Sequence, residues 1–386
     1  MRRLYVLLAG LMMILAGSRS IHAASTKTSP VTLRSIRMVS TRFGWGISRT
    51  HILRTSDGGR LWRDVTPPAY KPRNLGSLEG WTMLDARHAW IVGADPRPQH
   101  TEMGSAIVFR TSDGGQHWQQ SRRMAGYAGA RPDTLKFSDA KHGWLLLATS
   151  ASMSQAGWDV YQTDDGGATW MRVMHKGYQQ SAPHALPGCD CQLNLTFFDA
   201  AHGFATGYWG VAQNYSILSR SFDGGHSWYP MQLPLPPGFR IPFYATSPPT
   251  LSITGHGLML AHMVQPQAFV LYRTVNGGAT WQPGAALPGP AQVFFIAPGS
   301  FSIPDTQHAF VLVRSVLYRT DNAGLRWYVV NHHLPLPVGL THIQFLNAFT
   351  GFAIPVDESP EVDRSFLLTT HDGGRSWRRV SMMEQR

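Results

Sequence analysis

The chain of 386 residues is poor in cysteine and in charge. Its two cysteines, Cys189 and Cys191, are separated by one residue, so they could close only a tight, strained ring and cannot link distant segments. No standard zinc-ligand spacing surrounds this pair. Charged residues make up 15% of the chain and aromatic residues 11%, which excludes an intrinsically disordered protein. We therefore predict a packed domain without a metal or a cofactor.

Long apolar runs are also missing, with one exception at the N-terminus. Leu4–Gly17 is an apolar stretch of 14 residues that follows Arg2 and Arg3 and precedes the small residues Ala23 and Ala24. A transmembrane helix needs roughly 20 apolar residues, whereas this pattern is typical of a secretory signal peptide. We predict a signal peptide at residues 1–24, with an uncleaved anchor as the alternative. The mature chain is then exported (secreted, periplasmic, at the cell surface or membrane-associated) and has no integral membrane span.

The chain carries no dominant cluster of Lys and Arg interleaved with aromatic residues. Its formal net charge is +11, and removal of residues 1–24 would remove three arginines and no acidic residue. The sequence therefore argues against a nucleic-acid partner. The remaining basic balance favours acidic proteins, anionic polymers or a membrane surface.

One short motif recurs seven times, from Arg54–Trp62 to Thr369–Trp377. Each copy has a Ser or Thr, then an Asp or Asn two residues later, then a glycine pair or Ala-Gly, then a Trp. An Asp or Asn accepts local backbone N–H bonds in tight turns, glycine permits positive φ, and the Trp supplies a large apolar surface to the core. The acidic or amide residues are Asp57, Asp113, Asp165, Asp223, Asn276, Asn322 and Asp372, and the tryptophans are Trp62, Trp118, Trp170, Trp228, Trp281, Trp327 and Trp377.

A second pattern, of the kind Asp-Ala-Lys-His-Gly-Trp144, lies upstream in most repeats and indicates another strand–turn–strand unit. Each repeat then holds four strands, near 33–39, 43–48, 51–55 and 60–65 in the first. Seven units of four antiparallel strands predict an all-β, seven-bladed β-propeller. We expect one monomeric propeller domain at 25–386, with blades at about 31–66, 76–121, 133–174, 192–233, 250–285, 291–331 and 341–381.

The seven motifs resemble Asp-boxes, also called BNR repeats. Together with the upstream His-Gly-Trp turns, they make residues from about 31 to 381 similar to propellers of the photosystem II assembly and stability factor type. More distantly, the repeats resemble those of sortilin-type receptors, sialidases and xyloglucan-active glucanases. The resemblance implies a propeller but does not by itself assign a function.

Strand alternation predicts which face of the ring binds a partner. The turns between strands 1–2 and 3–4 share one face, where four recurring histidines, one in each of four blades, are too far apart to bind one metal ion. The opposite face carries longer loops, where binding residues usually lie. Basic and aromatic residues of these loops form the predicted binding face: Arg122, Arg123, Arg131, Trp158, Tyr178, Tyr208, Trp209, Arg240 and Tyr244.

An enzymatic function is the alternative. Phe239–Pro242 reads Phe-Arg-Ile-Pro, as in sialidases, but here it follows the fourth motif instead of preceding the first. A glucanase would need two carboxylates flanking a cleft, and no pair stands out in the sequence. We therefore expect no catalytic residues. The predicted function is an exported propeller that binds a protein partner in the cell envelope as an assembly or stability factor, with a carbohydrate-binding or glycan-hydrolysing propeller as the alternative.

Overall fold

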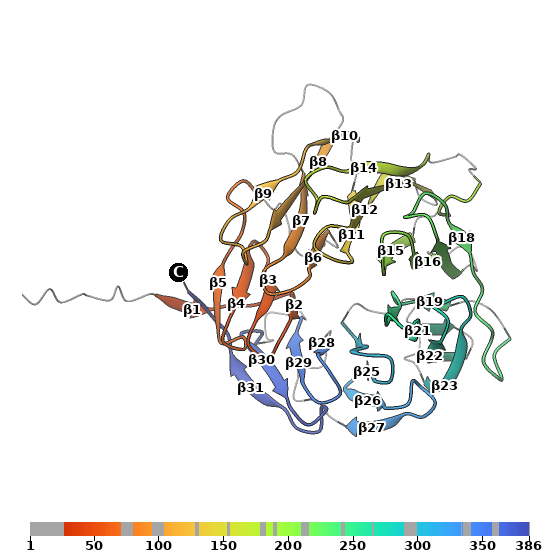
Figure 1. Cartoon of the computed structure of the whole chain (residues 1–386). Helices are drawn as coiled ribbons and strands as arrows, with labels where there is room; N and C mark the ends of the chain where they lie inside the picture. The colour runs from red at the N-terminus through yellow and green to blue at the C-terminus, as the bar shows by residue number, and fades with distance from the viewer. Residues whose placement is uncertain are drawn as a thin grey trace, which may run out of the picture.

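Seven sheets, antiparallel except for one parallel pair of strands in blade 1, are arranged as blades around a central axis (Figure 1). The computed structural model describes residues 27–70, 80–94, 104–127, 131–152, 155–177, 183–187, 191–209, 216–240, 244–264, 266–288, 299–332, 334, 341–356 and 363–385. The signal segment predicted at 1–24 lies outside these residues. No helix among them is long and apolar enough to cross a membrane.

The first three blades are built as follows. Blade 1 contains β1 (Thr28–Pro30), β2 (Ser35–Met38), β3 (Gly44–Ile47), β4 (Ile52–Thr55), β5 (Leu61–Asp64) and β32 (Met383–Gln385). Blade 2 contains β6 (Trp81–Met83), β7 (Ala89–Ala94), β8 (Gly104–Thr111), β9 (Gln119–Gln120) and β10 (Met124–Tyr127). Blade 3 contains β11 (Arg131–Phe137), β12 (Gly143–Ser152), β13 (Gln155–Thr163) and β14 (Met171–Lys176).

The other four blades complete the ring. Blade 4 contains β15 (Cys191–Phe197), β16 (Gly203–Trp209), β17 (Ser216–Ser221) and β18 (Tyr229–Pro230). Blade 5 contains β19 (Tyr244–Thr246), β20 (Thr250–Leu251), β21 (Gly257–Val264), β22 (Gln267–Thr274) and β23 (Gln282–Pro288). Blade 6 contains β24 (Phe301–Ser302), β25 (Ala309–Val313), β26 (Val316–Thr320) and β27 (Tyr328–Asn331). Blade 7 contains β28 (Thr341–Phe345), β29 (Gly351–Pro355), β30 (Phe366–Thr370) and β31 (Arg378–Ser381).

The predicted fold is confirmed: the chain forms a seven-bladed propeller with a basic unit of four antiparallel strands. In each blade the basic unit begins in the chain with its innermost strand, which in blade 1 is β2. The strands of the first repeat lie within the expected ranges, because the motif fixes the turn between the third and fourth strands.

The first and last described strands, β1 and β32, meet at blade 1 (Figure 1). β32 pairs with β5 in parallel, Met383 opposite Leu61, and β1 pairs with β32 in the antiparallel sense. Residues 28–30 therefore extend blade 1 through the C-terminal strand and do not join blade 7. This arrangement ties the last blade to the first by backbone hydrogen bonds.

Aromatic stacking between neighbouring blades fills the core. The ring of Trp90 lies 3.8 Å from that of Phe137 in blade 3, and Trp144 lies 3.8 Å from Phe197 in blade 4. The indole N–H groups of both tryptophans donate to carbonyl oxygens in the repeat turn of the next blade. The tryptophan of the upstream pattern thus joins blade 2 to blade 3 and blade 3 to blade 4.

Polar side chains of the innermost strands join the inner edges of the blades. Thr134 Oγ1 donates to the Leu193 carbonyl of blade 4 at 2.8 Å, and Ser302 Oγ accepts from the Phe345 N–H of blade 7. Gln344 of blade 7 bonds both the N–H and the carbonyl of Met38 in blade 1, at 2.8 and 2.7 Å. These bonds satisfy strand edges that no further strand covers.

Candidate functional site

The seven repeat turns share one hydrogen-bonding pattern. In the first, Thr55 Oγ1 donates to Asp57 at 2.9 Å and accepts from the Gly59 N–H at 3.0 Å. Asp57 also accepts the Leu61 N–H at 3.0 Å. The equivalent hydroxyl bonds occur in the other six turns, including those with Asn276 and Asn322. The recurring Ser/Thr and Asp/Asn residues therefore hold the turn together.

These hydrogen bonds keep the turn carboxylates ionised. Partial burial alone would raise the pKa of Asp113, but bonds from the backbone and side chain of His117 and from Thr111 outweigh it and lower that pKa to about 2. The pKa of Asp372 is also lowered to about 2, because bonds from Ser376 and Thr370 overcome the effect of burial. Such carboxylates are stabilised as anions and are poorly suited to act as general acids.

The seven repeat tryptophans, which the sequence predicts to lie in the core, are buried to different degrees. Trp62 and Trp228 are fully buried, and their indole N–H groups donate back to Gly59 and Gly225 of their own turns. Trp281 is also buried. The other four are half-buried: Trp118, Trp170, Trp327 and Trp377.

Each recurring histidine is bound by its own turn. Nδ1 of His88, His142 and His308 lies 2.8–2.9 Å from Asp85, Asp139 and Asp305, respectively. His202 makes the same contact with Asp199 at 2.9 Å. The four rings therefore pair with separate carboxylates in separate blades. Among the residues that the structure describes, no group of three or more His, Cys, Asp or Glu side chains is arranged to hold a metal ion.

The arginine that precedes the Ser/Thr in most repeats bridges two blades. Arg110 Nη1 donates to the Asp165 carbonyl of blade 3 at 2.9 Å. The guanidinium of Arg220 lies 4.5 Å from the ring of Phe222 and 5.6 Å from that of Phe204, both of blade 4, and its Nη2 atom would lie 3.9 Å from a Cβ added at Gly277 of blade 5. These residues pack between blades, as the stems and heads of long cationic side chains often do.

Trp158 was predicted to belong to the binding face, and this prediction is wrong. Its side chain is 1% exposed, packs in the core between blades 3 and 4, and donates from Nε1 to the Pro187 carbonyl at 3.1 Å. It cannot present a surface to a partner. The apolar strand that carries Trp158 is buried on this side by the next blade, which the sequence of one repeat does not reveal.

The arginines of the predicted face occupy separate places. Arg122 and Arg123 are exposed, and the Arg122 N–H donates to the Ala168 carbonyl in the repeat turn of blade 3. They therefore lie beside a repeat turn at the seam between blades 2 and 3, and not among the opposite loops as expected. Arg240 is exposed and follows the outer strand of blade 4.

The remaining predicted residues sit at strand ends near the ring axis. Arg131 begins β11, Tyr208 and Trp209 end β16, and Tyr244 begins β19. β11 lies beside β15, β15 pairs with β16, and β16 lies beside β19, so the backbone brings these four positions to neighbouring blades. Their side chains and the whole of Tyr178 lie outside the described residues.

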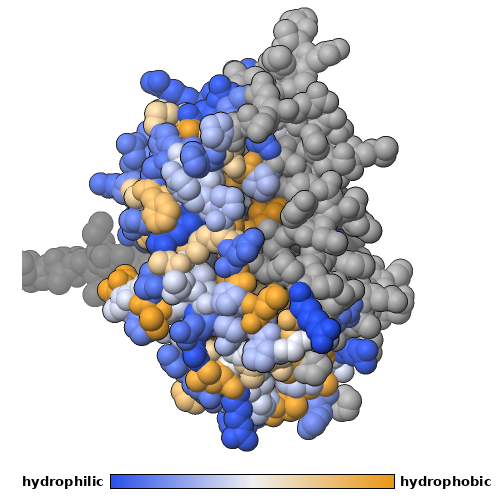
Figure 2. All heavy atoms as spheres, turned by 90° about the vertical axis from the view of Figure 1, so that its right-hand side faces the viewer, coloured by the Kyte–Doolittle hydropathy of each residue, from blue (hydrophilic) through white to orange (hydrophobic). Residues whose placement is uncertain are grey.

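Departures from the repeat pattern define a surface that we call the blade 4–5 patch. It consists of Arg220, Phe222, Tyr229, Ile253 and Val275. Phe222, Tyr229 and Val275 are 49%, 42% and 66% exposed, and Ile253 is fully exposed. Figure 2 views the molecule from the side of these blades and shows apolar side chains among hydrophilic ones toward its lower left.

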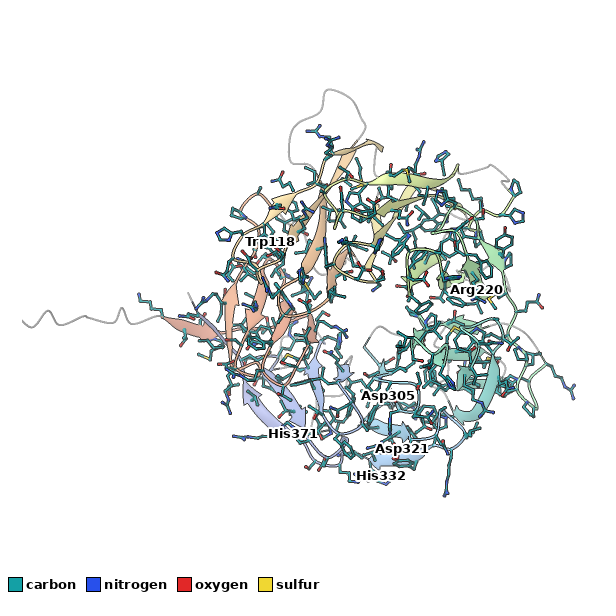
Figure 3. The ribbon with its side chains drawn as sticks, in the orientation of Figure 1. Trp118, Arg220, Asp305, Asp321, His332 and His371 are labelled. Carbon is teal, nitrogen blue, oxygen red and sulfur yellow. The ribbon has the colours of Figure 1, made fainter. Side chains whose placement is uncertain are left out.

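Contacts place the two turns of blade 5 beside Arg220 of blade 4. The Arg220 guanidinium stacks on Phe222. A methyl group added at Gly277, in the turn of blade 5, would lie 3.9 Å from Nη2 of Arg220. The Gly277 N–H in turn donates to the Gly255 carbonyl, two residues after Ile253. The two turns of blade 5, Ser252–His256 and Thr274–Trp281, contain no Asp, Glu, Lys or Arg. Figure 3 shows Arg220 among the side chains of blade 4, beside blade 5.

A second cluster of polar side chains lies in blade 6, where Asp321 occupies the place of Ser56 and Asp164. Its carboxylate accepts from Arg319 Nε at 2.5 Å and from the Tyr328 hydroxyl, and lies 3.6 Å from His308 Nε2. Burial and the bond to Asp321 raise the pKa of Tyr328 to about 12. A small cavity of about 280 Å³ is lined by Asp321, Asn322, Arg326 and Tyr328 (Figure 3 labels Asp321). Tyr328 is thus a proton donor and a poor nucleophile.

Sequence reasoning treated all turn residues as structural and missed the blade 4–5 patch. The available signal was the residue between the Ser/Thr and the Asp/Asn of each motif. It is Ser, Ser and Asp in the first three repeats but Phe222 in the fourth and Val275 in the fifth. The turn itself does not require an apolar side chain at this position. Apolar residues there in two consecutive repeats therefore mark a surface with another role.

No known family model matches the chain, and no curated protein matches its sequence. Solved structures do resemble it. A GH74 xyloglucanase from Xanthomonas campestris superposes with a TM-score of 0.58 at 13% identity, over 93% of this chain and 55% of that chain. Puromycin hydrolase gives a TM-score of 0.50 at 12% identity, over 91% of this chain and 53% of that chain.

The chain shares the propeller fold of these proteins. At such identities the likeness concerns the fold alone, and the chain spans about half the length of both enzymes. A structure of YCF48 bound to a D1 peptide is a further match, with a TM-score of 0.47 and 15% identity over 90% of this chain and 96% of that chain.

Proposed function

We propose that this chain is an exported, non-catalytic Asp-box propeller that binds a protein partner, as an assembly or stability factor for an envelope complex. The blade 4–5 patch carries the proposal. Exposed apolar side chains on adjacent elements mark surfaces that become buried in complexes. None of the five patch residues belongs to the hydrophobic core clusters of blades 4 and 5, so core packing does not account for their apolar character.

Arg220 gives the patch a preference for acidic partners. Its guanidinium packs on Phe222, and no described carboxylate pairs with it. Burial lowers its pKa, which reflects partial loss of water around the charge. An acidic side chain of a partner would restore this interaction while apolar groups beside it cover Ile253 and Val275.

Export rests on the segment at 1–24, and the assembly role on the resemblance of the repeats. In each of the seven turns, the Ser or Thr hydroxyl bonds both the carboxylate or amide of the Asp or Asn and a glycine N–H. This repeated pattern supports the assignment of the turns as Asp-boxes. The absence of a catalytic function remains part of the proposal.

Affinity capture tests this function. The mature chain, residues 25–386, is used as bait on the envelope fraction of the native host. A variant with Ile253→Ser and Val275→Ser should lose a specific protein partner that the unaltered chain retains. Phe349→Ser, which removes another exposed apolar side chain in blade 7, a blade that does not adjoin blades 4 and 5, is the matched control. Equal capture by all three proteins would refute the patch as the binding surface.

Carbohydrate binding is the second candidate, and one observation favours it. The exposed ring of Tyr229 lies 4.7 Å from that of His184 and 5.9 Å from that of Phe222. Adjacent aromatic faces of this kind can stack on sugar rings. Binding on a glycan array that Tyr229→Ala abolishes, without capture of any protein partner, would replace the first proposal by this one.

A further inference from the structure

The sixth repeat departs from the others at the place of Arg326, four residues after the Asp or Asn of the motif. In repeats 2, 3, 5 and 7 the side chain at this place bonds that Asp or Asn, as Thr280 Oγ1 does when it accepts from Asn276 Nδ2 at 2.9 Å. Asn322 uses its Oδ1 atom to accept from Thr320 Oγ1 and from the backbone N–H of Arg326. Its Nδ2 atom and the Arg326 guanidinium have no hydrogen-bond partner within the described ranges, so both remain available as donors.

Asp321 supplies an acceptor beside these donors, and three groups fix its carboxylate. Arg319 Nε donates to Oδ1 at 2.5 Å, the Tyr328 hydroxyl donates to Oδ2, and His308 Nε2 lies 3.6 Å from Oδ1. Burial alone would raise the pKa of Asp321, but the bonds from Tyr328 and Arg319 lower it, so the carboxylate is ionised near pH 7. The oxygens of an ionised carboxylate have several lone pairs, and Asp321 can therefore accept further hydrogen bonds from a ligand.

One small cavity brings these groups together. Asp321, Asn322, Arg326 and Tyr328 line a volume of about 280 Å³. Pockets for drug-sized ligands begin at about 300 Å³, so this volume suits a single small molecule. The lining combines donors, from Asn322 and Arg326, with acceptors, from Asp321 and the Tyr328 oxygen. A hydroxyl group both donates and accepts, so it is the ligand group that matches such a lining.

The charges around the cavity favour a ligand that also carries an anionic group. Asp321 is paired with the buried guanidinium of Arg319, and Asp305 is paired with His308 Nδ1 at 2.8 Å. Arg326 lines the cavity, and no carboxylate within the described ranges forms an ion pair with it. A carboxylate or a phosphate group can accept two parallel hydrogen bonds from such a guanidinium.

We propose that the cavity of blade 6 binds an acidic sugar, meaning a small ring with several hydroxyl groups and one carboxylate or phosphate group. Arg326 holds the anionic group, Asp321 and Tyr328 accept from the hydroxyl groups, and Asn322 donates to one of them. None of these residues belongs to the blade 4–5 patch, so the site is separate from the surface proposed for the protein partner.

Isothermal titration calorimetry of the mature chain near pH 7 tests this site with D-glucuronate, D-glucose 6-phosphate and neutral D-glucose as probes. We expect saturable binding of at least one acidic probe. Glucose should bind about tenfold more weakly than that probe, because it has no anionic group for Arg326. The acidic probe that binds more tightly identifies the anionic group as a carboxylate or as a phosphate.

Two variants restore residues that other repeats have. Arg326→Thr should remove the preference for the acidic probe and should fold, because Thr169 and Thr280 occupy this place in repeats 3 and 5. Asp321→Ser, which restores the residue found at Ser56, should weaken the binding of every probe about tenfold or more, because it removes the charged acceptor. Thermal unfolding of both variants separates lost binding from lost folding.

Arg314→Gln is the matched control. It removes an exposed arginine of the same blade, in the turn between β25 and β26, at the end of β26 that lies away from the cavity. It should bind all three probes like the unaltered chain. Failure of both acidic probes to bind at millimolar concentration, equal affinity for glucose and the acidic probes, or unchanged binding by Arg326→Thr would overturn the proposal.

Discussion

Residues that look equivalent in the repeat differ in what they bury. Trp228 is fully enclosed between blades, and its indole N–H bonds Gly225, whereas Trp170 at the same motif position is only half-buried. The hydrophobic contribution of a side chain scales with the area that it removes from water, so identical motif residues need not stabilise the fold equally.

This difference predicts unequal effects of truncation. Trp228→Ala should lower the free energy of unfolding by about 3–5 kcal/mol, as the loss of a buried aromatic side chain does. Trp170→Ala should cost less, because part of its ring already contacts solvent. Urea denaturation of the two variants measures both values. A change below about 1 kcal/mol for Trp228→Ala would contradict its assignment to the core.

At the scale of the element, each repeat turn depends on a left-handed backbone position. Gly58 and Gly277 occupy it with φ of 79° and 66°, but repeat 6 has Ala323 there, with φ of 56°. A residue with a Cβ is strained in this region by about 1–2 kcal/mol. The sixth turn therefore retains a strain that the other turns avoid.

Ala323→Gly should relieve this strain. We expect a gain of about 0.5–1 kcal/mol in unfolding free energy, since the greater chain entropy of unfolded glycine offsets part of the benefit. The reciprocal change Gly277→Ala should destabilise, although only Arg220 lies near its added methyl group. Thermal unfolding compares the two. Destabilisation by Ala323→Gly would show that backbone conformation is not the deciding factor at this position.

The turn carboxylates also make stability depend on pH. Asp372 has a folded-state pKa of about 2, below its usual 3.8, so its stabilising contribution is present above pH 4 and is lost as the pH falls toward 2. Asp372→Asn should therefore flatten the loss of stability between pH 4 and pH 2. Asn276 and Asn322 accept the same hydroxyl bond in their turns, so the variant should fold. Acid unfolding curves identical to those of the unaltered chain would argue against the lowered pKa.

For the whole molecule, the closure at blade 1 links the first and last residues of the propeller. β32 lies between β1 and β5, and it is the strand of this link that pairs directly with the four-strand unit of blade 1. Removal of residues 383–386 should cost about 2–4 kcal/mol, from a few backbone hydrogen bonds at about 1 kcal/mol each. Removal of the N-terminal residues up to Pro30 should cost less, because β1 contacts the blade through β32 alone. Equal effects in urea denaturation would show that closure depends on the N-terminal strand.

The sequence by itself determined the number of blades, the four-strand unit and the location of the turns, because each feature depends on local chemistry that recurs seven times. The Ser or Thr, the Asp or Asn and the glycines of each motif form a turn regardless of the segments that surround it. Even the apolar positions of the blade 4–5 patch are visible as departures from that pattern, once the repeat is known to form a surface.

The tertiary structure decided what the neighbours of each blade would cover. It buried Trp158, placed Arg122 beside a repeat turn of blade 3, and joined β32 in parallel to β5. These outcomes depend on contacts between residues far apart in the chain, such as Met38 and Gln344, which are separated by 306 positions. Local patterns cannot specify them, because the burial of a strand face is set by the blade packed against it.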